Sequence, residues 1–307
     1  MPAFKTAFVL SGQGSQNTGM GKSLYEASKK AREVMDIADR VLPGLKELCF
    51  YGSKEELSRT VNTQPAVMTV DVMCALAVME AGVKPDALAG FSLGELAALS
   101  VSGMLPFETA LRLVVRRAEL MDECAESSES TMAAVVKLSE SDTALVAERF
   151  AAYPANFNCP GQIVVSLKRS EVSQFSSAVR EMGGRAIPLS VSGGFHSPYM
   201  SPAAASFGKA LSGVEFAKPQ AAVYSNFTSD IYEFGSEAEL LQKQIDHPIY
   251  WEKVVRRMSD SGVGAFIECG PGVTLSGLIK KTGVPARVLN VESAESLADA
   301  LKALREA

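Results

Sequence analysis

The chain has 307 residues, of which 47% are hydrophobic and 21% are charged; this suits one large α/β domain with an insertion, or two average domains, and excludes a disordered or fibrous chain. A net charge of −5 argues against broad nucleic-acid binding, which needs a surface that neutralises phosphates. The five cysteines show no CxxC spacing, so we expect no metal site and no disulfide framework, and a reducing compartment is favoured. The apolar runs are expected to be too short to cross a membrane, and residues 1–16 lack the signal-peptide pattern, so we expect a cytoplasmic protein.

The first predicted elements alternate between strand and helix. Short apolar runs bounded by turn residues indicate buried strands, and longer apolar runs with helical periodicity indicate helices. The predicted strands are residues 6–10 and 86–90, and the predicted helices are residues 66–81 and 93–101. This alternation predicts a mainly parallel sheet that helices cover on both faces.

The middle of the chain has a different pattern. Its six predicted elements follow the order β-α-β-β-α-β, at residues 132–136, 142–150, 154–157, 162–167, 171–182 and 185–189. This order is that of the ferredoxin-like unit. The first pattern then resumes, with strands predicted at 222–224 and 265–268. We therefore predict a large hydrolase-like α/β domain (1–127 plus 194–307), a small ferredoxin-like subdomain (128–193) that interrupts it, and a cleft between them.

The segment Gly90-Phe91-Ser92-Leu93-Gly94 matches the G-x-S-x-G pattern and joins a predicted strand to a predicted helix. A nucleophile elbow needs this setting, because the glycines allow a sharp turn and the serine hydroxyl stands clear at the helix N-terminus. There the backbone N–H of Leu93 can donate to an oxyanion. The alternative is an ordinary glycine-rich turn between a strand and a helix.

Two histidines are available as the base that a serine nucleophile requires. His196 lies where the small subdomain is expected to return to the large domain, and His247 lies in a polar stretch before a proline. Because a loop beside a cleft is the better place for a base, we favour His196. For either residue, the alternative is a surface histidine or one whose hydrogen bonds are satisfied in the core.

The glycine-rich segment of residues 12–16 follows the first predicted strand. With Gly21-Lys22-Ser23 it is similar to a phosphate-binding loop, but that motif requires glycine at position 16, where this chain has Gln16. A P-loop nucleotidase is therefore a poor interpretation. A turn of this kind can instead offer backbone N–H groups to a developing oxyanion.

Arg117 lies on the apolar side of a helix predicted at residues 108–123. An arginine that points inward requires an anion, because an unpaired buried charge costs too much free energy. The periodicity leaves two partners open: an internal carboxylate in a salt bridge, and a carboxylate of the substrate. The planar fork of the guanidinium group suits either one.

Eight motifs in this order resemble those of the malonyl-CoA:acyl carrier protein transacylase family of fatty-acid synthesis, and the similarity covers nearly the whole chain. They are GQGSQ at 12–16, NTQPA at 62–66, GFSLGE at 90–95, Arg117, NFNCPGQ at 156–162, GGFHSP at 193–198, YSN at 224–226 and ECGPG at 268–272. The chain departs from the pattern at Phe91, where the family usually has a histidine before the nucleophile.

The resemblance implies a role for each residue of the reaction centre. Ser92 would be acylated, with His196 acting first as base and then as acid. The backbone N–H groups of Gln13 and Leu93 would form the oxyanion hole. The main-chain carbonyl of Gln244 would orient the histidine, so no aspartate is needed to complete a triad.

The resemblance also implies how the substrates are held. Arg117 would bind the malonyl carboxylate. Phe195 would crowd an α-methyl branch, since Gly-Gly-Phe-His is close to the Gly-Ala-Phe-His form of malonyl-selective members. The remaining implied contacts are Gln64 and Asn156 for the substrate. Because the chain has a net charge of −5, an acidic carrier protein needs a local basic patch, and we take Lys280 and Lys281 as the candidates for it.

We therefore predict a ping-pong acyltransferase. Malonyl-CoA acylates the serine, CoA leaves, and the phosphopantetheine thiol of acyl carrier protein takes the malonyl group. We expect no bound cofactor or metal and a monomeric enzyme. The alternatives are a stand-alone acyltransferase serving a polyketide synthase, a serine thioesterase or esterase, and a non-catalytic docking protein, which would require a broken Ser–His pair.

Overall fold

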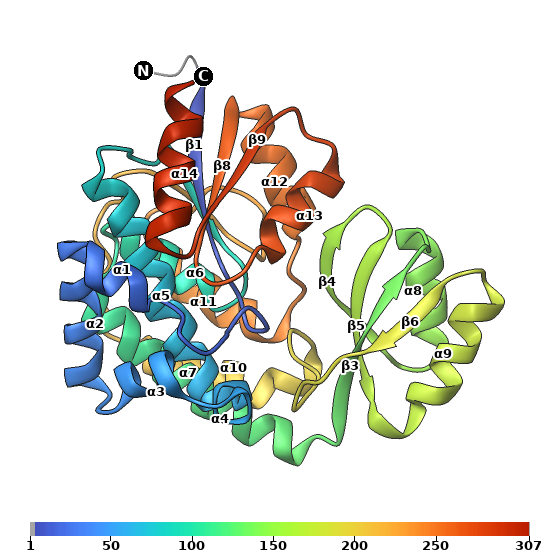
Figure 1. The fold of residues 1–307 in the computed structure, drawn as a ribbon. Helices are drawn as coiled ribbons and strands as arrows, with labels where there is room; N and C mark the ends of the chain where they lie inside the picture. The colour runs from blue at the N-terminus through green and yellow to red at the C-terminus, as the bar shows by residue number, and fades with distance from the viewer. Residues whose placement is uncertain (1–3, 307) are drawn as a thin grey trace.

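The computed structural model describes residues 4–306, and these contain two separate β-sheets (Figure 1). Sheet A is entirely parallel, in the order β7 (Ala222–Tyr224), β2 (Ala87–Gly90), β1 (Lys5–Leu10), β8 (Val263–Cys269), β9 (Arg287–Val291). Sheet B is antiparallel, in the order β4 (Tyr153–Cys159), β5 (Gln162–Lys168), β3 (Ser130–Val136), β6 (Arg185–Pro188). The predicted fold class, a parallel α/β sheet with a small ferredoxin-like unit, is confirmed.

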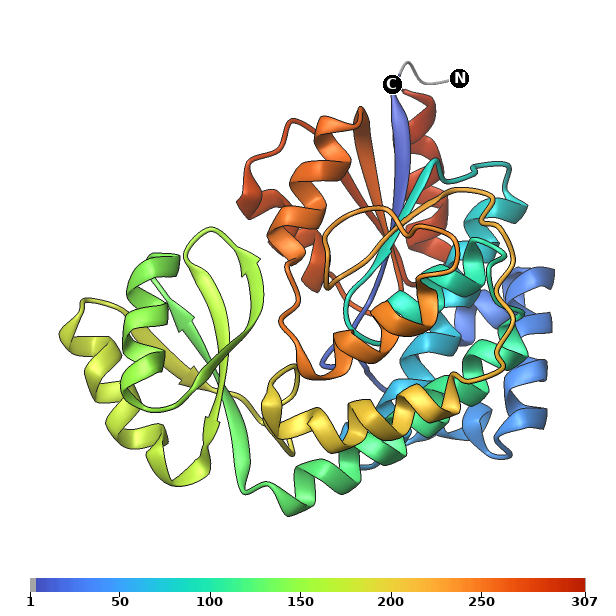
Figure 2. The ribbon, with the colours of Figure 1, turned by 180° about the vertical axis from the view of Figure 1, so that it is seen from behind.

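Helices pack on both faces of sheet A (Figures 1 and 2). Alternate residues of β1 point to opposite sides, as the two-residue period of a strand requires, so Phe8 and Leu10 belong to one core and Ala7 and Val9 to another. The second core is closed by α12 (Trp251–Asp260) and α13 (Thr274–Thr282). The first core contains α1 (Lys22–Ala27), α2 (Lys29–Val41), α3 (Leu45–Tyr51), α4 (Lys54–Ser58), α5 (Thr60–Glu80), α6 (Gly94–Val101), α7 (Phe107–Ser127), α10 (Ser201–Ala210), α11 (Glu237–Asp246) and α14 (Ala294–Arg305).

Helix α5 is apolar on all sides, which is typical of a helix at the centre of a core. It begins six residues before the predicted helix 66–81, because packing against its neighbours extends it through Pro65. By length and composition it could cross a membrane, so the expectation that no apolar run reaches that length is wrong. Within the protein, however, 83% of its most apolar window is buried, as in a core helix.

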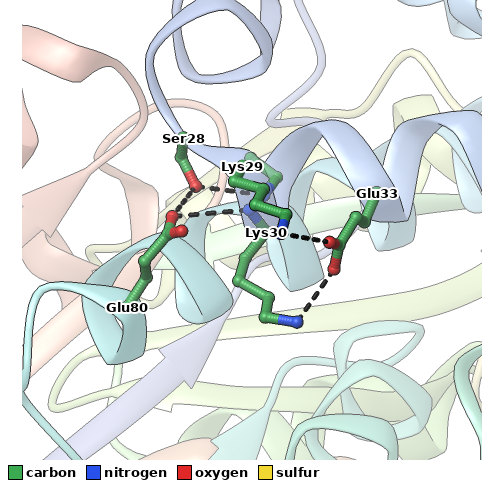
Figure 3. A network of polar contacts seen from close by, with 6 residues as sticks. Ser28, Lys29, Lys30, Glu33 and Glu80 are labelled. Carbon is green, nitrogen blue, oxygen red and sulfur yellow. Dashed lines mark hydrogen bonds and ion pairs between the residues drawn. The ribbon is translucent and has the colours of Figure 1, made fainter.

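A network of polar contacts joins the start of α2 to the end of α5 (Figure 3). The Ser28 hydroxyl accepts from the backbone N–H of Ala31, which caps the helix, and donates to Glu80 Oε2 over 2.5 Å. The backbone N–H of Lys30 also donates to Glu80, and the Lys30 ammonium group pairs with Glu33. These contacts attach α2 to the central helix α5. The sequence patterns did not predict α2.

Helices pack on only one face of sheet B, and the other face is turned toward the large domain. Its elements follow the predicted order, with α8 (Glu140–Arg149) after β3, and with η1 (Arg169–Glu171) and α9 (Val172–Glu181) after β5. Ala133, Val135 and Val165 pack against these helices, while Met132, Ala134 and Val164 line a cleft against the large domain. The unit lies within the predicted segment 128–193, and the exact division of the chain into domains stays a prediction.

A short bridge connects sheet B to the large domain. Ile249, which precedes α12, pairs with β4: its N–H donates to Ala155 O over 2.9 Å and its carbonyl accepts from Phe157 N over 2.8 Å. Within the small unit the Arg169 guanidinium donates to the carbonyl oxygens of Ser130 and Ser192, and so ties together the two chain segments that enter and leave it. The backbone bridge at Ile249 therefore helps to set the position of one wall of the cleft relative to the other.

Candidate active site

Ser92 lies in a sharp turn between β2 and α6. Its φ of 56° falls in the left-handed region, which a serine rarely occupies and which is typical of a nucleophile elbow. A Cβ at Gly90 would lie 1.8 Å from the carbonyl carbon of Gly94, and a Cβ at Gly94 would lie 2.5 Å from the carbonyl oxygens of Leu10 and Ser11. The turn closes only because both positions are glycine, which explains the spacing seen in the sequence.

Ser92, His196 and Gln244 form a chain of hydrogen bonds. Ser92 Oγ lies 2.8 Å from His196 Nε2, and His196 Nδ1 lies 2.7 Å from the carbonyl oxygen of Gln244. Because a carbonyl can only accept, Nδ1 carries the proton and Nε2 is left to accept from the serine hydroxyl. Burial and the nearby Arg117 charge lower the pKa of His196 to about 3, so the imidazole is a neutral base at ordinary pH.

His247 lies outside this arrangement. Its side chain is exposed, and Nδ1 lies 2.7 Å from Asp246 Oδ1 and 3.0 Å from Lys243 O. Of the two histidines, the structure therefore brings His196, the one favoured from the sequence, to the serine.

The two N–H groups expected to form an oxyanion hole donate to no acceptor within residues 4–306. They are those of Gln13, on a loop that lines the cleft, and Leu93, which follows the serine. The N–H of Ser92, by contrast, donates to Asn226 Oδ1 over 2.8 Å. Two uncommitted donors therefore remain beside the serine, as an oxyanion hole requires.

Arg117 is buried, with only 1% of its surface exposed, as its helical phase predicted. Its Nη1 donates to Gln64 Oε1 over 2.7 Å, and its Nη2 donates to Ser92 Oγ over 3.0 Å and to Gln244 Oε1 over 2.8 Å. Burial lowers its pKa to about 10, which still leaves it charged. No carboxylate among residues 4–306 forms a direct ion pair with it. Of the two partners left open, the internal salt bridge is therefore not the one this structure contains.

A buried network behind the serine was not predicted from the sequence. Glu95, one turn after the elbow, is fully buried and accepts hydrogen bonds from the Tyr232 hydroxyl, the Asn226 N–H and Gln244 Nε2. Burial raises the pKa of Glu95 to about 7, although these donors and Arg117 oppose the shift. Two signals were available: Glu95 completes the GFSLGE motif, and the rest of its helix is apolar on all sides, which is typical of a buried helix.

The cleft has a volume of about 270 Å³ and brings together residues from both walls. Phe195 and Asn156, predicted to contact substrate, both line it and are buried. Gln64 also lines it, but its oxygen is engaged by Arg117 and its nitrogen lies 3.6 Å from Met121 Sδ. Asn158, which was not singled out from the sequence, lines the cleft with an Oδ1 atom that is buried and has no protein partner among the residues described.

The candidate docking lysines lie on α13 and are exposed. Lys281 Nζ lies 3.3 Å from Oε1 of Gln162, a residue that lines the cleft. This places Lys281 at the mouth of the cleft.

Phe91, the departure from the family's pattern, packs in an aromatic pair with Trp251, with ring centroids 5.5 Å apart. A Cβ at Gly12 would lie 2.8 Å from the Phe91 ring, so the ring rests directly on the loop that carries Gln13. The Phe91 ring therefore makes an apolar contact that holds the glycine-rich loop in place.

The fold and the site together have the features of α/β enzymes that move acyl groups through a serine nucleophile: an elbow, a neutral base, free N–H donors and a nearby fixed cation. Within residues 4–306 no group of three or more histidine, cysteine, aspartate or glutamate side chains could hold a metal ion.

Comparison with known proteins agrees with this class. Residues 7–303 match the acyl transferase domain family. The malonyl CoA-acyl carrier protein transacylase of Bacillus subtilis is 38% identical over 310 residues, covering 98% of both chains. The malonyl CoA-acyl carrier protein transacylase structure from Clostridium perfringens superposes with a TM-score of 0.94 at 35% identity, covering 98% of both chains. The chain therefore belongs to the acyl transferase family, and the predicted resemblance to its malonyl-CoA:acyl carrier protein transacylases is confirmed.

Polyketide enzymes are also among the relatives. The polyketide biosynthesis malonyl CoA-acyl carrier protein transacylase PksC of Bacillus subtilis is 37% identical over 281 residues, covering 89% of this chain and 96% of the relative. A malonyl-transacylase solved in complex with a type II polyketide acyl-carrier protein superposes with a TM-score of 0.93 at 33% identity, covering 97% and 99% of the two chains.

Proposed function

We propose that this acyltransferase moves the malonyl group from malonyl-CoA to the phosphopantetheine thiol of acyl carrier protein, through a malonyl ester on Ser92, in fatty-acid biosynthesis. The observation that supports this best is a buried arginine 3.0 Å from the serine hydroxyl, with no carboxylate of residues 4–306 in direct contact. A cation in that position suits an acyl group that ends in a carboxylate. The names of the relatives agree with this substrate.

In the first half-reaction, His196 Nε2 takes the proton of the Ser92 hydroxyl as Oγ attacks the thioester carbonyl carbon. The carbonyl oxygen becomes an oxyanion that accepts from the N–H groups of Gln13 and Leu93. The C–S bond then breaks, and CoA leaves as a thiol with the proton that the histidine took. The Gln244 carbonyl holds Nδ1–H throughout and stabilises the imidazolium that forms.

The second half-reaction reverses these steps with a different thiol. The phosphopantetheine thiol of the carrier protein gives its proton to His196 and attacks the ester carbonyl. The bond between the acyl carbon and Ser92 Oγ breaks, and Oγ regains a proton from the imidazolium. Arg117 holds the malonyl carboxylate in both halves, and Phe195 crowds an α-methyl branch.

The small unit supplies contacts along the substrate. Asn156 and Asn158 lie next but one to each other on β4 and both face the cleft, and the unpaired Oδ1 of Asn158 suits an N–H of the pantetheine arm. Gln64 acts on the substrate through Arg117, whose guanidinium it holds. Lys281 at the mouth and its exposed neighbour Lys280 form a basic patch for the carrier.

A second candidate pathway has specific support. Two of the relatives described above are named for polyketide biosynthesis, and a stand-alone enzyme of that pathway would keep the same site and differ in its carrier. Transfer rates to a fatty-acid carrier and a polyketide carrier, measured side by side, decide between the two. A cytoplasmic location, a monomeric state and the absence of a cofactor stay predictions from the sequence.

Intact-mass analysis after mixing with malonyl-CoA, and then with acyl carrier protein, tests the proposal. We expect a malonyl adduct that disappears as malonyl-carrier forms, and no adduct on Ser92→Ala, which loses one oxygen and keeps the fold. A stable malonyl adduct on Ser92→Ala would overturn the assignment of the nucleophile. Release of malonate faster than transfer would favour a serine thioesterase.

A further inference from the structure

Arg117 poses an electrostatic problem that its direct contacts do not solve. The guanidinium group is fully buried, and its three partners, Gln64, Ser92 and Gln244, are all neutral. A buried cation without a compensating anion is strongly destabilising. The enzyme without substrate therefore needs a negative charge near Arg117.

In its ionised form, Glu95 supplies that charge from the far side of one amide group. Gln244 Oε1 accepts from Arg117 Nη2 over 2.8 Å, while Gln244 Nε2 donates to Glu95 Oε2 over 2.6 Å. The Glu95 carboxylate favours the charged form of Arg117, and Arg117 favours the charged form of Glu95. The two charges thus act on each other through an oriented dipole.

The contacts around Glu95 fix the direction of this dipole. An amide has one accepting and one donating end, and a carboxylate can only accept, so the Nε2 end of Gln244 must face Glu95. The same Nε2 donates to the carbonyl oxygen of Ser92 over 2.7 Å. With the amide turned over, Nε2 would face the guanidinium donors and Oε1 would face two acceptors. Glu95 is itself held by the Tyr232 hydroxyl and the Asn226 N–H.

We propose that Glu95 is a positioning residue that acts as the counter-charge of Arg117, held one amide away so that the guanidinium stays open to the carboxylate of the incoming acyl group. This inference rests on the proposed function of Arg117. A carboxylate in direct contact would compete with the substrate, and the absence of any carboxylate would make the buried cation too costly. The Gln244 amide meets both requirements, and so makes Glu95 a determinant of the preference for an anionic acyl group.

Three variants test the proposal, each measured for kcat/KM with malonyl-CoA and acetyl-CoA and for Tm. Glu95→Gln keeps the size but removes the charge and sets two donors against each other. We expect malonyl acylation to fall about 100-fold, acetyl acylation to fall much less, and Tm to drop. Tyr232→Phe is the matched control: it removes one donor to Glu95, keeps the charge, and should change the malonyl-to-acetyl ratio less than about threefold.

The double variant Glu95→Gln with Gln244→Glu separates positioning from stability. It moves the carboxylate into direct contact with Arg117, so we expect Tm to recover relative to Glu95→Gln while the KM for malonyl-CoA stays at least about tenfold raised. Because its charges remain paired, it also carries the test if Glu95→Gln fails to fold. Recovery of malonyl preference together with Tm, or equal losses on both substrates in Glu95→Gln, would overturn the inference. A wild-type enzyme that malonyl-CoA does not acylate would instead overturn the proposed function on which the inference depends.

Discussion

The two walls of the cleft satisfy their polar groups in different ways. On the wall built on sheet A, each functional side chain is bonded to the next, from Arg117 through Gln244 to Glu95, and from Ser92 to His196. The wall built on sheet B presents apolar side chains of β3 and β5 and two asparagines that make no side-chain hydrogen bond within residues 4–306.

This difference separates the reacting groups and the arginine for the acyl carboxylate from the contacts for the rest of the substrate. A network whose members fix one another holds reacting groups in place before substrate arrives, which is the condition for electrostatic catalysis. An unpaired buried acceptor has no such function until a ligand supplies its donor. We therefore expect changes on the sheet A wall to alter rates or the choice of acyl group, and changes on the sheet B wall to alter affinity for the rest of the substrate.

His196→Ala should break the sheet A wall most severely. Loss of the base that activates the serine should reduce acylation by malonyl-CoA about 1,000-fold or more, measured as the rate of adduct formation. His247→Ala is the matched control and should change this rate little, since that side chain is exposed and paired with Asp246. The opposite order of effects would show that the wrong histidine has been chosen.

Arg117→Ala should change which acyl group is preferred. Because acetyl-CoA has no carboxylate for the guanidinium group, malonyl acylation should fall about 100-fold relative to acetyl acylation, in kcat/KM measured for both. A thermal melt recorded in parallel reports on the fold. Equal losses on both substrates, with a lowered Tm, would instead make the arginine a structural element of the core.

Asn158→Leu tests the sheet B wall. Removing an acceptor that no protein group uses should raise the KM for malonyl-CoA about tenfold, leave kcat within about threefold, and leave Tm unchanged or higher. Steady-state kinetics and a melt measure all three. A fall in kcat with unchanged KM would show that this wall also takes part in the chemistry, and would remove the distinction between the two walls.

Lys280→Glu with Lys281→Glu should have the smallest effect, because surface charges are screened by solvent. The KM for the acidic carrier protein should rise a few-fold at low salt and depend less on salt, with malonyl-CoA acylation unchanged. Lys302→Glu on α14, which packs on the other face of sheet A, is a suitable control (Figure 1). An unchanged KM for the carrier would exclude these lysines from the docking surface.

The sequence predicts the reacting residues better than it predicts the buried network that holds them in place. The elbow, the β-α-β-β-α-β order and the inward phase of Arg117 follow from local patterns of glycine and apolar residues, and the structure contains all three. The partners of Glu95 could not be found in this way, since Tyr232, which donates to it, lies 137 residues further along the chain. The strand order of sheet A likewise depends on contacts between distant segments. The sequence pattern missed the start of α5, because a proline such as Pro65 suggests a helix boundary. In the structure, tertiary packing holds the helix together through this proline.

The burial of His196 and Glu95 links folding to proton binding at two groups, with opposite signs. The pKa of His196 falls from 6.5 to about 3, so as pH drops through that range the unfolded chain binds a proton that the native protein does not, and stability is lost. The pKa of Glu95 rises from 4.5 to about 7, so its stabilising contribution is lost as pH rises through that range. Between pH 4.5 and 6.5 the two slopes cancel. Removing the carboxyl in Glu95→Gln leaves the imidazole unopposed, and the unfolding free energy should then climb with pH by about 1.4 kcal/mol per unit more steeply than in the wild type.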